Sequence, residues 1–350
     1  MHIGDRMSSK PFIKDRKAIS QSAWLVIVAV LLAGVIGLSW YFQTAQQAEQ
    51  RVLTISTTTS LYDTGLLENA IAPAFKEKTG IELHFIPKGT GAAIQDAMNG
   101  AADAIIVHAR SKELDFMEKG YGVNRKVIAY NFFAIVGPED DPAGIRGLSP
   151  VEALKKIVEE GRKGNAIWVS RDDGSGTNTK EIALWKKAGF NYSEIKNEPW
   201  FRCTGTGMGK TLNYCNNVRA YTLSDMGTYL KYRKDGLIDL DVLVDEGEEL
   251  INIYSIIVVN PEKYNKDFDG AMQLAKWLVS EEGQKIIGEY GVEEYGRPLF
   301  YPAVEVLEKK SGDIYNWIVK YGFIEDNGVW SECPEKYRYK ANIEFFEVKI

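Results

Sequence analysis

Residues 52–107 decide the fold, and they read VLTISTTTSLYDTGLLENAIAPAFKEKTGIELHFIPKGTGAAIQDAMNGAADAIIV. Short apolar runs at 52–55, 81–86 and 104–107 have the composition of strands. The residues between them have helical spacing, and Gly80 is placed to end the first of these helices. Strands that alternate with short helices are typical of a parallel α/β sheet.

A second cycle of the same kind follows, with predicted helices at 150–161 and 179–188. Long apolar strands are expected near 131–136 and 251–259, and we interpret them as a hinge between two α/β lobes. One large sheet domain followed by a helical tail is the alternative. The predicted boundaries are 51–133 for the first part of lobe 1, 134–254 for lobe 2, and 255–350 for the return into lobe 1 and the C-terminal tail.

The N-terminal residues predict an exported protein. Residues 1–22 are rich in basic side chains, residues 23–42 are an uncharged run of twenty residues, and residues 43–50 form a polar linker. At ~1.5 Å per residue such a run spans roughly 30 Å, the thickness of a bilayer core. The basic residues before it keep that end in the cytoplasm and place the rest outside. We expect a transmembrane anchor; a cleaved signal peptide, which would also export the chain, stays open.

Composition excludes several classes of function. The chain has 350 residues and a formal net charge of −6, so it has no general basic field for nucleic acid. Its three histidines and three cysteines do not have the spacing of a zinc site, and no cofactor is expected. Cys203 and Cys215 are close enough in sequence to form a disulfide outside the cell, and two free thiols are the alternative.

Three segments rich in small hydroxyl side chains each stand between a predicted strand and a predicted helix. They are 56–60 (STTTS), 89–91 (GTG) and 173–177 (DGSGT). A helix N-terminus has unpaired N–H groups and a partial positive charge, and hydroxyls there can donate to the same anion. Each segment alone has the composition of a helix cap. Together they predict an oxyanion site where the strands end.

The residue types restrict the choice of oxyanion but do not identify one. Donors alone favour a fully deprotonated oxyanion such as sulfate, molybdate or tungstate, whereas phosphate near neutral pH also needs an acceptor. The segment 204–211 is not a P-loop, because a threonine stands where the first glycine is required. A hydrolase would need a histidine within reach of a nucleophile, and no motif supplies that pair. Four aspartates near the motifs leave phosphate open: Asp63, Asp172, Asp173 and Asp225.

As a set, these motifs resemble those of the tungstate-binding proteins of ABC uptake systems. The resemblance begins with Thr57-Thr58-Thr59-Ser60 followed by LYDTGL, and it covers about residues 52–305. The TTTS run alone would be a weak signal, but the motifs are specific together. The others are 89–91 (GTG), 103–110 (DAIIVHAR), 130–141, 170–181, 205–212, 220–230 (AYTLSDMGTYL), 282–284 (EGQ) and 296–300 (GRPLF).

The resemblance implies a type II periplasmic-binding-protein fold. In that fold two α/β lobes, joined by a hinge of two strands, hold an oxyanion between them without any enzymatic reaction. By resemblance, Thr58, Thr59 and Ser60 would supply hydroxyl and backbone donors from lobe 1. Thr90 would supply a second hydroxyl from the same lobe.

The resemblance also assigns one arginine and the donors of the other lobe. Arg110 matches the arginine associated with the tungstate pocket. Ser175, Gly176 and Thr177 would form the donor set of lobe 2. Asp172 departs from the family pattern and adds a possible negative charge beside the anion, which makes the contacts of lobe 2 less certain.

The sequence therefore predicts an extracytoplasmic solute-binding protein that captures tungstate and hands it to the permease subunits of an ABC importer. It is expected to be a monomer without a cofactor, to bind no nucleic acid, and to be held at the membrane by residues 23–42. Molybdate is the closest alternative ligand, because its size and charge are nearly the same, and phosphate is next. A membrane-anchored hydrolase is the alternative from a different class.

Overall fold

The computed structural model describes residues 24–26, 28–35, 51–245, 247–340 and 343–346. The chain divides into two compact units, residues 1–50 and 51–350. In the first unit, residues 24–26 and 28–35 are helical, and the other residues of the predicted segments 1–22, 23–42 and 43–50 lie outside the described ones. Within the described residues, no helix has both the length and the apolar character needed to cross a membrane.

The unit 51–350 begins with a sheet whose first strands are parallel. β1 (Val52–Thr58) pairs in parallel with β2 (Glu82–Lys88) and β3 (Ala104–Val107). β9 (Ile251–Val259) is antiparallel to β3, so the sheet is mixed. The spatial order is β10-β4-β9-β3-β1-β2, where β4 is Gly122–Gly137 and β10 is Tyr301–Pro302. The strands predicted at 104–107 and 251–259 are confirmed residue for residue.

A helix begins within three residues after each of the first three strands. α2 (Thr59–Tyr62) follows β1, α4 (Thr90–Met98) follows β2, and α5 (Arg110–Glu118) follows β3. The helix predicted at 66–78 is divided into a π-helical turn, η1 (Leu67–Ile71), and α3 (Ala72–Thr79). It ends at Gly80, whose φ of 75° is strained for any residue with a side chain.

The middle of the chain forms a second group of strands and helices. The last residues of β4 pair with β7 (Thr222–Asp225) and β8 (Asp241–Val244), while β5 (Trp168–Ser170) and β6 (Phe201–Cys203) form a parallel pair. Ser149 and Glu152 form a capping box that starts the first helix of this group. The helices are α6 (Pro150–Arg162), α7 (Gly176–Lys187), α8 (Tyr192–Ile195), α9 (Met208–Val218), α10 (Met226–Lys234) and η2 (Glu248–Leu250). Cys203 and Cys215 are both free thiols.

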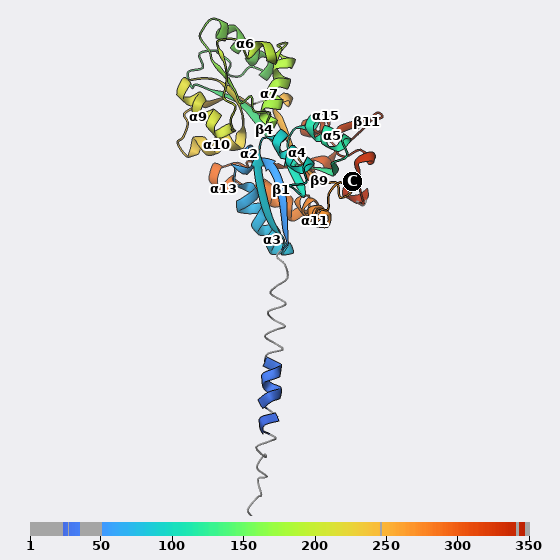
Figure 1. Ribbon diagram of the computed structural model, residues 1–350. Coiled ribbons are helices and arrows are strands. Elements are labelled where there is room, and N and C mark those ends of the chain that lie inside the picture. Colours follow the sequence, from blue (N-terminus) through green and yellow to red (C-terminus); the bar gives the residue numbers. More distant parts are fainter. Residues whose placement is uncertain (1–23, 27, 36–50, 246, 341–342, 347–350) are drawn as a thin grey trace, which may run out of the picture. The chain divides into compact units, whose positions relative to one another are not determined.

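The long strand β4 connects two separate groups of buried apolar side chains. Up to Phe132 it pairs with β9, and from Phe133 onward it pairs with β7. The clusters around the second group of elements contain buried residues between 133 and 250 and no others. The remaining clusters draw on residues 53–130 and 251–345. We call these two parts region 2 and region 1; Figure 1 shows α6, α7, α9 and α10 of region 2 gathered at one end of the unit.

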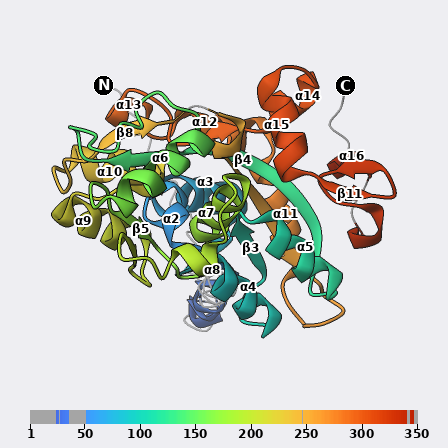
Figure 2. The same cartoon turned by 90° about the horizontal axis from the view of Figure 1, so that it is seen from above.

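The last part of the chain returns to region 1. Figure 2 shows α14, α15 and α16 gathered on one side, next to β4 and α5. Glu332 of this tail is buried and pairs with Lys126 of β4 at 2.9 Å. Its second oxygen accepts the backbone N–H of Val127. The elements are α11 (Phe268–Leu278), α12 (Glu281–Glu289), α13 (Val292–Tyr295), α14 (Val304–Lys309), α15 (Asp313–Gly322), β11 (Ile324–Asp326), β12 (Val329–Ser331), η3 (Glu335–Tyr337) and α16 (Ile343–Phe346).

Candidate functional site

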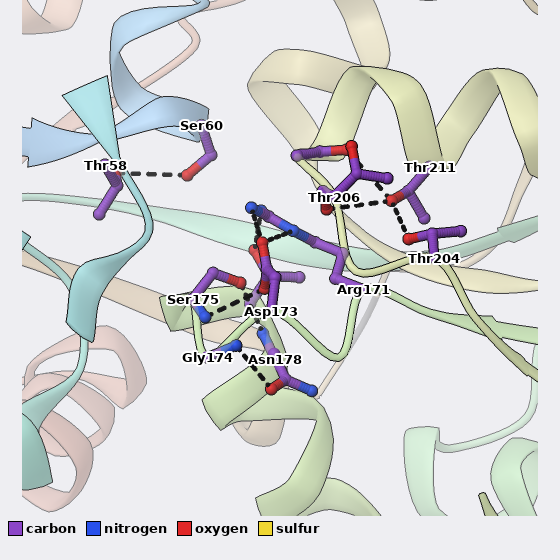
Figure 3. Close-up of polar contacts among 12 residues, drawn as sticks. Thr58, Ser60, Arg171, Asp173, Gly174, Ser175, Asn178, Thr204, Thr206 and Thr211 are labelled. Atoms are coloured by element: carbon purple, nitrogen blue, oxygen red, sulfur yellow. Dashed lines mark hydrogen bonds and ion pairs between the residues drawn. The ribbon is translucent and has the colours of Figure 1, made fainter. Parts of the chain in front are cut away.

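The three hydroxyl-rich segments meet where strands end and helices begin. Thr58 ends β1 and caps α2, Thr90 is the first residue of α4, and Ser175 caps α7. All three residues are no more than 2% exposed. Figure 3 shows Thr58 and Ser60 on one side, with Ser175, Asp173 and Arg171 facing them. Segments far apart in the sequence, from both regions, thus share one buried site.

The surroundings of two glycines show how closely region 1 and region 2 approach each other at this site. A Cβ placed on Gly89 of region 1 would lie 3.6 Å from the carbonyl oxygen of Asp173 in region 2. A Cβ placed on Gly207, which caps α9 in region 2, would lie 3.9 Å from Oγ1 of Thr59. Both distances are ordinary van der Waals contacts. The helix starts of the two regions therefore touch around the hydroxyl groups.

Gly176 is required by this contact. A Cβ on Gly176 would lie 2.3 Å from the ring of His108, and the imidazole is buried in a fixed position between the regions. No larger residue fits without moving the two regions apart. Lys112 of α5 adds a second link, because its ammonium group donates to the carbonyl oxygen of Gly174.

Two threonine hydroxyls in the site have no partner. Oγ1 of Thr59 and Oγ1 of Thr90 are buried, and neither makes a hydrogen bond to any described residue. Leaving a buried hydroxyl unpaired costs ~1–3 kcal/mol. Ser60, in contrast, donates to Oγ1 of Thr58 at 3.3 Å. Two unpaired donors on the starts of two helices are the arrangement expected of a site that awaits a hydrogen-bond acceptor.

Arg171 is the arginine that the structure places in this site, and the sequence analysis did not select it. It follows β5 and is only 2% exposed. Its Nε and Nη2 donate to Oδ2 of Asp173 at 3.0 and 2.6 Å, and its Nη1 donates to Oγ1 of Thr177 at 3.3 Å. In Figure 3 the guanidinium group lies between Ser175 and Ser60. A fixed cation therefore stands beside the hydroxyl cluster.

Arg110 has different partners. Its Nη1 donates to the backbone carbonyls of Lys320 and Phe323 at 2.8 and 3.1 Å, at the end of α15. Burial lowers its pKa, and the nearby cation Arg125 adds to this effect. Its described hydrogen bonds thus join it to the C-terminal tail, and none joins it to the hydroxyl cluster.

The acidic residue that departs from the expected motif is neutralised. Asp172 pairs with Lys196 at 3.1 Å, and the hydroxyl of Tyr192 donates to its other oxygen at 3.0 Å. Both partners follow Asp172 by at least twenty residues, so the sequence motif alone does not reveal them. The negative charge of Asp172 is therefore already compensated within region 2.

The donors of α7 are arranged as the start of a helix. Oγ of Ser175 accepts the N–H of Asn178, and the N–H of Ser175 is taken by Asp173. Gly176 and Thr177 are the first two residues of the helix, where backbone N–H groups have no partner inside the helix. Thr177 is buried and accepts from Arg171. These groups form the side of the site that belongs to region 2.

Ser60 and His108 lie close together, which sequence reasoning did not foresee. Oγ of Ser60 is 3.4 Å from Nε2 of His108. Burial lowers the pKa of this imidazole to about 3, and its ring packs against Tyr254 and Phe133. No carboxylate accepts from its Nδ1 among the described residues. A base this weak, without a carboxylate to orient it, lacks what a hydrolase needs.

Asp225 is the remaining ionisable group near the site. It caps α10, and its Oδ1 accepts from the N–H and the hydroxyl of Thr228 at 2.8 and 2.9 Å. Burial raises the pKa of this carboxyl to about 6. In the part of the chain that the structure describes, no group of three or more His, Cys, Asp or Glu residues could hold a metal ion. The hydroxyls of Thr59 and Thr90, which have no partner among the described residues, are donors of the kind that suits an anion.

Comparison with known proteins gives consistent matches. A family model described as the PBP superfamily domain matches residues 43–282. The tungstate-binding protein TupA of Peptoclostridium acidaminophilum is 41% identical over 252 residues, which are 71% of this chain and 84% of that protein. The solved structure of TupA from Desulfovibrio alaskensis G20 is 40% identical with a TM-score of 0.62, and the match covers 72% of this chain and 98% of that one. The structure of the tungstate ABC transporter from Geobacter sulfurreducens is 42% identical with a TM-score of 0.61, covering 68% and 98%.

Proposed function

The chain belongs to the tungstate-binding proteins of ABC transporters, and we propose that it captures tungstate between its two regions and delivers it to the permease subunits of an importer. The observation that carries this proposal is the pair of buried, unpartnered hydroxyls of Thr59 and Thr90. They lie where helix starts of both regions meet, and Figure 3 shows the buried Arg171 on the side of Asp173 and Ser175 that faces Thr58 and Ser60.

The proposed ligand shell has two sides. Region 1 contributes Thr58, Thr59 and Ser60 with Thr90, and region 2 contributes the start of α7. Tungstate carries two negative charges and no proton, so donors on every side satisfy it. Hydrogen bonds to a charged group contribute ~1.5–3 kcal/mol each. Six or seven of them leave room for sub-micromolar affinity after the costs of desolvation and ordering.

We propose Arg171 in place of Arg110 as the arginine of the shell. Its guanidinium group is buried beside Ser175 and Thr177, and its pairing with Asp173 holds it in one orientation. Arg110 is engaged by the tail instead. The donors that we propose for region 2 are those expected from the sequence at the start of α7: Ser175, Gly176 and Thr177.

A binding role without catalysis follows from the same geometry. The one serine–histidine contact in the site, Ser60 with His108, lacks a usable base because burial lowers the imidazole pKa to about 3. The histidine instead offers a neutral ring that supports the Ser60 hydroxyl. The family of this chain consists of binding proteins, in agreement with that assignment.

We propose that regions 1 and 2 are lobes that close on the ligand. Boundaries at 51–133, 134–254 and 255–350 are expected from the sequence, and two features of the structure support a division near them: β4 changes partner at Phe133, and the buried clusters divide between Leu250 and Ile251. The chain passes between the regions within β4 and again just before β9, and a rotation there would separate the glycine contacts of the site. The ligand would favour the closed arrangement because only there do both donor sets reach it.

The chain is proposed to work outside the cytoplasm as a monomer, held at the membrane by residues 23–42. The support is the twenty-residue uncharged run that follows a basic segment. A cleaved signal peptide would give the same location without an anchor. The mass of the chain after membrane extraction separates these two outcomes.

Isothermal titration calorimetry of the full chain tests the function. Tungstate should bind one-to-one with sub-micromolar affinity, and sulfate and phosphate should bind at least a hundredfold more weakly. Molybdate has nearly the same size and charge as tungstate, so it is the ion that competes most closely. Tightest binding of phosphate would show that the site supplies an acceptor as well as donors, and it would overturn the assignment.

A further inference from the structure

His108 also forms part of the wall of a second cavity, of about 210 Å³. The wall is made by the start of α5, one face of α7, the start of β9 and the end of α15. It includes Gly176 but none of Thr58, Thr59, Ser60 and Thr90. The cavity is therefore separate from the hydroxyl cluster, although it lies between the same two regions.

Two cations reach this cavity without a carboxylate partner. Nζ of Lys180 donates to the backbone carbonyls of Glu249 and Ile251 at 3.0 and 2.7 Å. Arg110 donates only to backbone carbonyls of the tail among its described partners. Burial lowers the pKa of Lys180 to about 8, and the charge of Arg110 contributes to the same shift. Both cations are half-buried, and a cation shielded from water without an opposite charge is costly, so this pair favours an anion.

The other charges of the wall cancel one another. Arg125 pairs with Glu113 at 2.8 Å, and both side chains are 1% exposed. Lys187 pairs with the carboxylate of Glu249. The uncompensated charge of the cavity is thus that of Lys180 and Arg110.

Part of the remaining wall is apolar, and its polar members are Ser111, Thr179 and Asn252. Leu184 and Ile253 are buried, and the ring of Tyr321 lies 5.2 Å from Nζ of Lys180. The volume exceeds that of the roughly 150 Å³ engineered cavity, in another protein, that binds benzene. An occupant therefore has room for an apolar body as well as a charged end. Tyr321 lies outside the matched domain, residues 43–282, so the tail completes a wall that the domain alone does not have.

We propose that this cavity binds a small organic carboxylate, with its charged end between Lys180 and Arg110 and its apolar body against Leu184 and Ile253. The carboxylate would supply the negative charge that both cations lack. An inorganic anion would satisfy the cations but leave the apolar side empty. The size and the mixed wall together favour a compound of about the size of benzoate.

Calorimetric titration of the full chain with benzoate tests this site. We expect one-to-one binding with a dissociation constant of about 1 mM or below. Benzyl alcohol has the same ring without the charge and inorganic phosphate has charge without the ring, so each should bind at least tenfold more weakly. Equal binding of either compound would overturn the proposal.

Variants identify the cations. Lys180→Gln and Arg110→Gln should each weaken benzoate binding at least tenfold, since each removes one charge-assisted hydrogen bond. Arg162→Gln is the matched control, because Arg162 is an exposed arginine of α6 that pairs with Glu198. Circular dichroism shows whether each variant is folded, and two cation variants keep the test decisive if one of them is not. Unchanged benzoate affinity in a folded variant of either cation would overturn the proposal.

A competition experiment separates the two sites. Benzoate should bind at least as tightly with saturating tungstate as without it, because closure brings the two sides of the wall together; this arm rests on the proposed function. Loss of benzoate binding on addition of tungstate would mean that the cavity is part of the oxyanion site. Failure of tungstate to bind would overturn the proposed function and leave the benzoate titration as an independent result.

Discussion

Replacing Thr90 by valine should stabilise the ligand-free protein and weaken the complex. The substitution keeps the shape of the side chain and removes the hydroxyl, whose oxygen is buried without a partner among the described residues. Because an unpaired buried hydroxyl costs ~1–3 kcal/mol, its removal should raise the free energy of unfolding by up to that amount. A rise of this size corresponds to a few degrees in the melting temperature of a domain of this length.

In the tungstate complex the effect has the opposite sign. The hydroxyl of Thr90 would then donate to a doubly charged oxyanion, a hydrogen bond of ~1.5–3 kcal/mol. Its loss should weaken binding roughly tenfold to a hundredfold. Thermal unfolding without ligand measures the first effect, and calorimetric titration with tungstate measures the second.

Thr57→Val is the matched control on the neighbouring strand. Thr57 is equally buried, but its Oγ1 donates to the carbonyl oxygen of Ile106 at 2.8 Å. This variant should therefore lose stability by about 1 kcal/mol and keep its affinity for tungstate. The reasoning is refuted if Thr90→Val loses stability in the ligand-free state and binds tungstate as the unmodified chain does. That result would mean that the Thr90 hydroxyl has a partner inside the protein.

The remaining predictions concern the arginine, the motion, a carboxyl group and the tail. Arg171→Lys should weaken tungstate binding roughly tenfold to a hundredfold in calorimetry, because an ammonium group cannot replace a guanidinium that bonds on several sides. Arg110→Lys should weaken it less than about threefold. A larger loss of affinity in Arg110→Lys than in Arg171→Lys would restore Arg110 to the site. Small-angle scattering should show a smaller radius of gyration with tungstate than without it, and an unchanged radius would contradict lobe closure. The folded-state pKa of Asp225, about 6, lies above its ordinary 3.8, so the folded protein holds an extra proton between about pH 4 and 6 and loses stability as the pH rises through that range. Asp225→Asn should remove this part of the dependence of the unfolding free energy on pH, measured by urea unfolding. Parallel curves of unfolding free energy against pH for both proteins would contradict the prediction. Glu332→Gln should lower the free energy of unfolding by ~3–5 kcal/mol in the same assay, because it leaves Lys126 buried without its partner. A loss below about 1 kcal/mol would mean that the pair is solvated.

The apolar strands were predictable because their pattern is simple. Residues 104–107 and 251–259 are buried along their whole length, and a run rich in isoleucine and valine signals such strands without knowledge of their neighbours. The first half of β4 was not predicted, because it contains Asn124, Arg125 and Lys126. Those side chains are buried in the structure, which their residue types do not suggest.

The sequence was enough to place the threonine hydroxyls of the candidate site at helix starts, but it was not enough to choose the arginine beside them. Thr59 and Thr90 stand at helix starts that the strand–helix alternation already marks. The choice between Arg110 and Arg171 depends on partners elsewhere in the chain. Arg110 is taken by carbonyls of the tail, more than two hundred residues later. Arg171 is held by Asp173 and Thr177, and Asp172 beside it is neutralised by Lys196, so the charged motif is less acidic than its sequence suggests.

The C-terminal tail supplies the negative charge that the cations in the first half of β4 need. Two adjacent cations in a buried strand are destabilising unless each has an opposite charge. Arg125 has Glu113 of α5, in region 1, but Lys126 has Glu332, which lies beyond the matched domain. The backbone carbonyl of Glu332 also accepts from Arg125 at 2.7 Å, so one residue of the tail serves both cations. The tail is therefore part of the folded core next to β4, and the charges of β4 become compatible with a buried strand because the chain continues past residue 305.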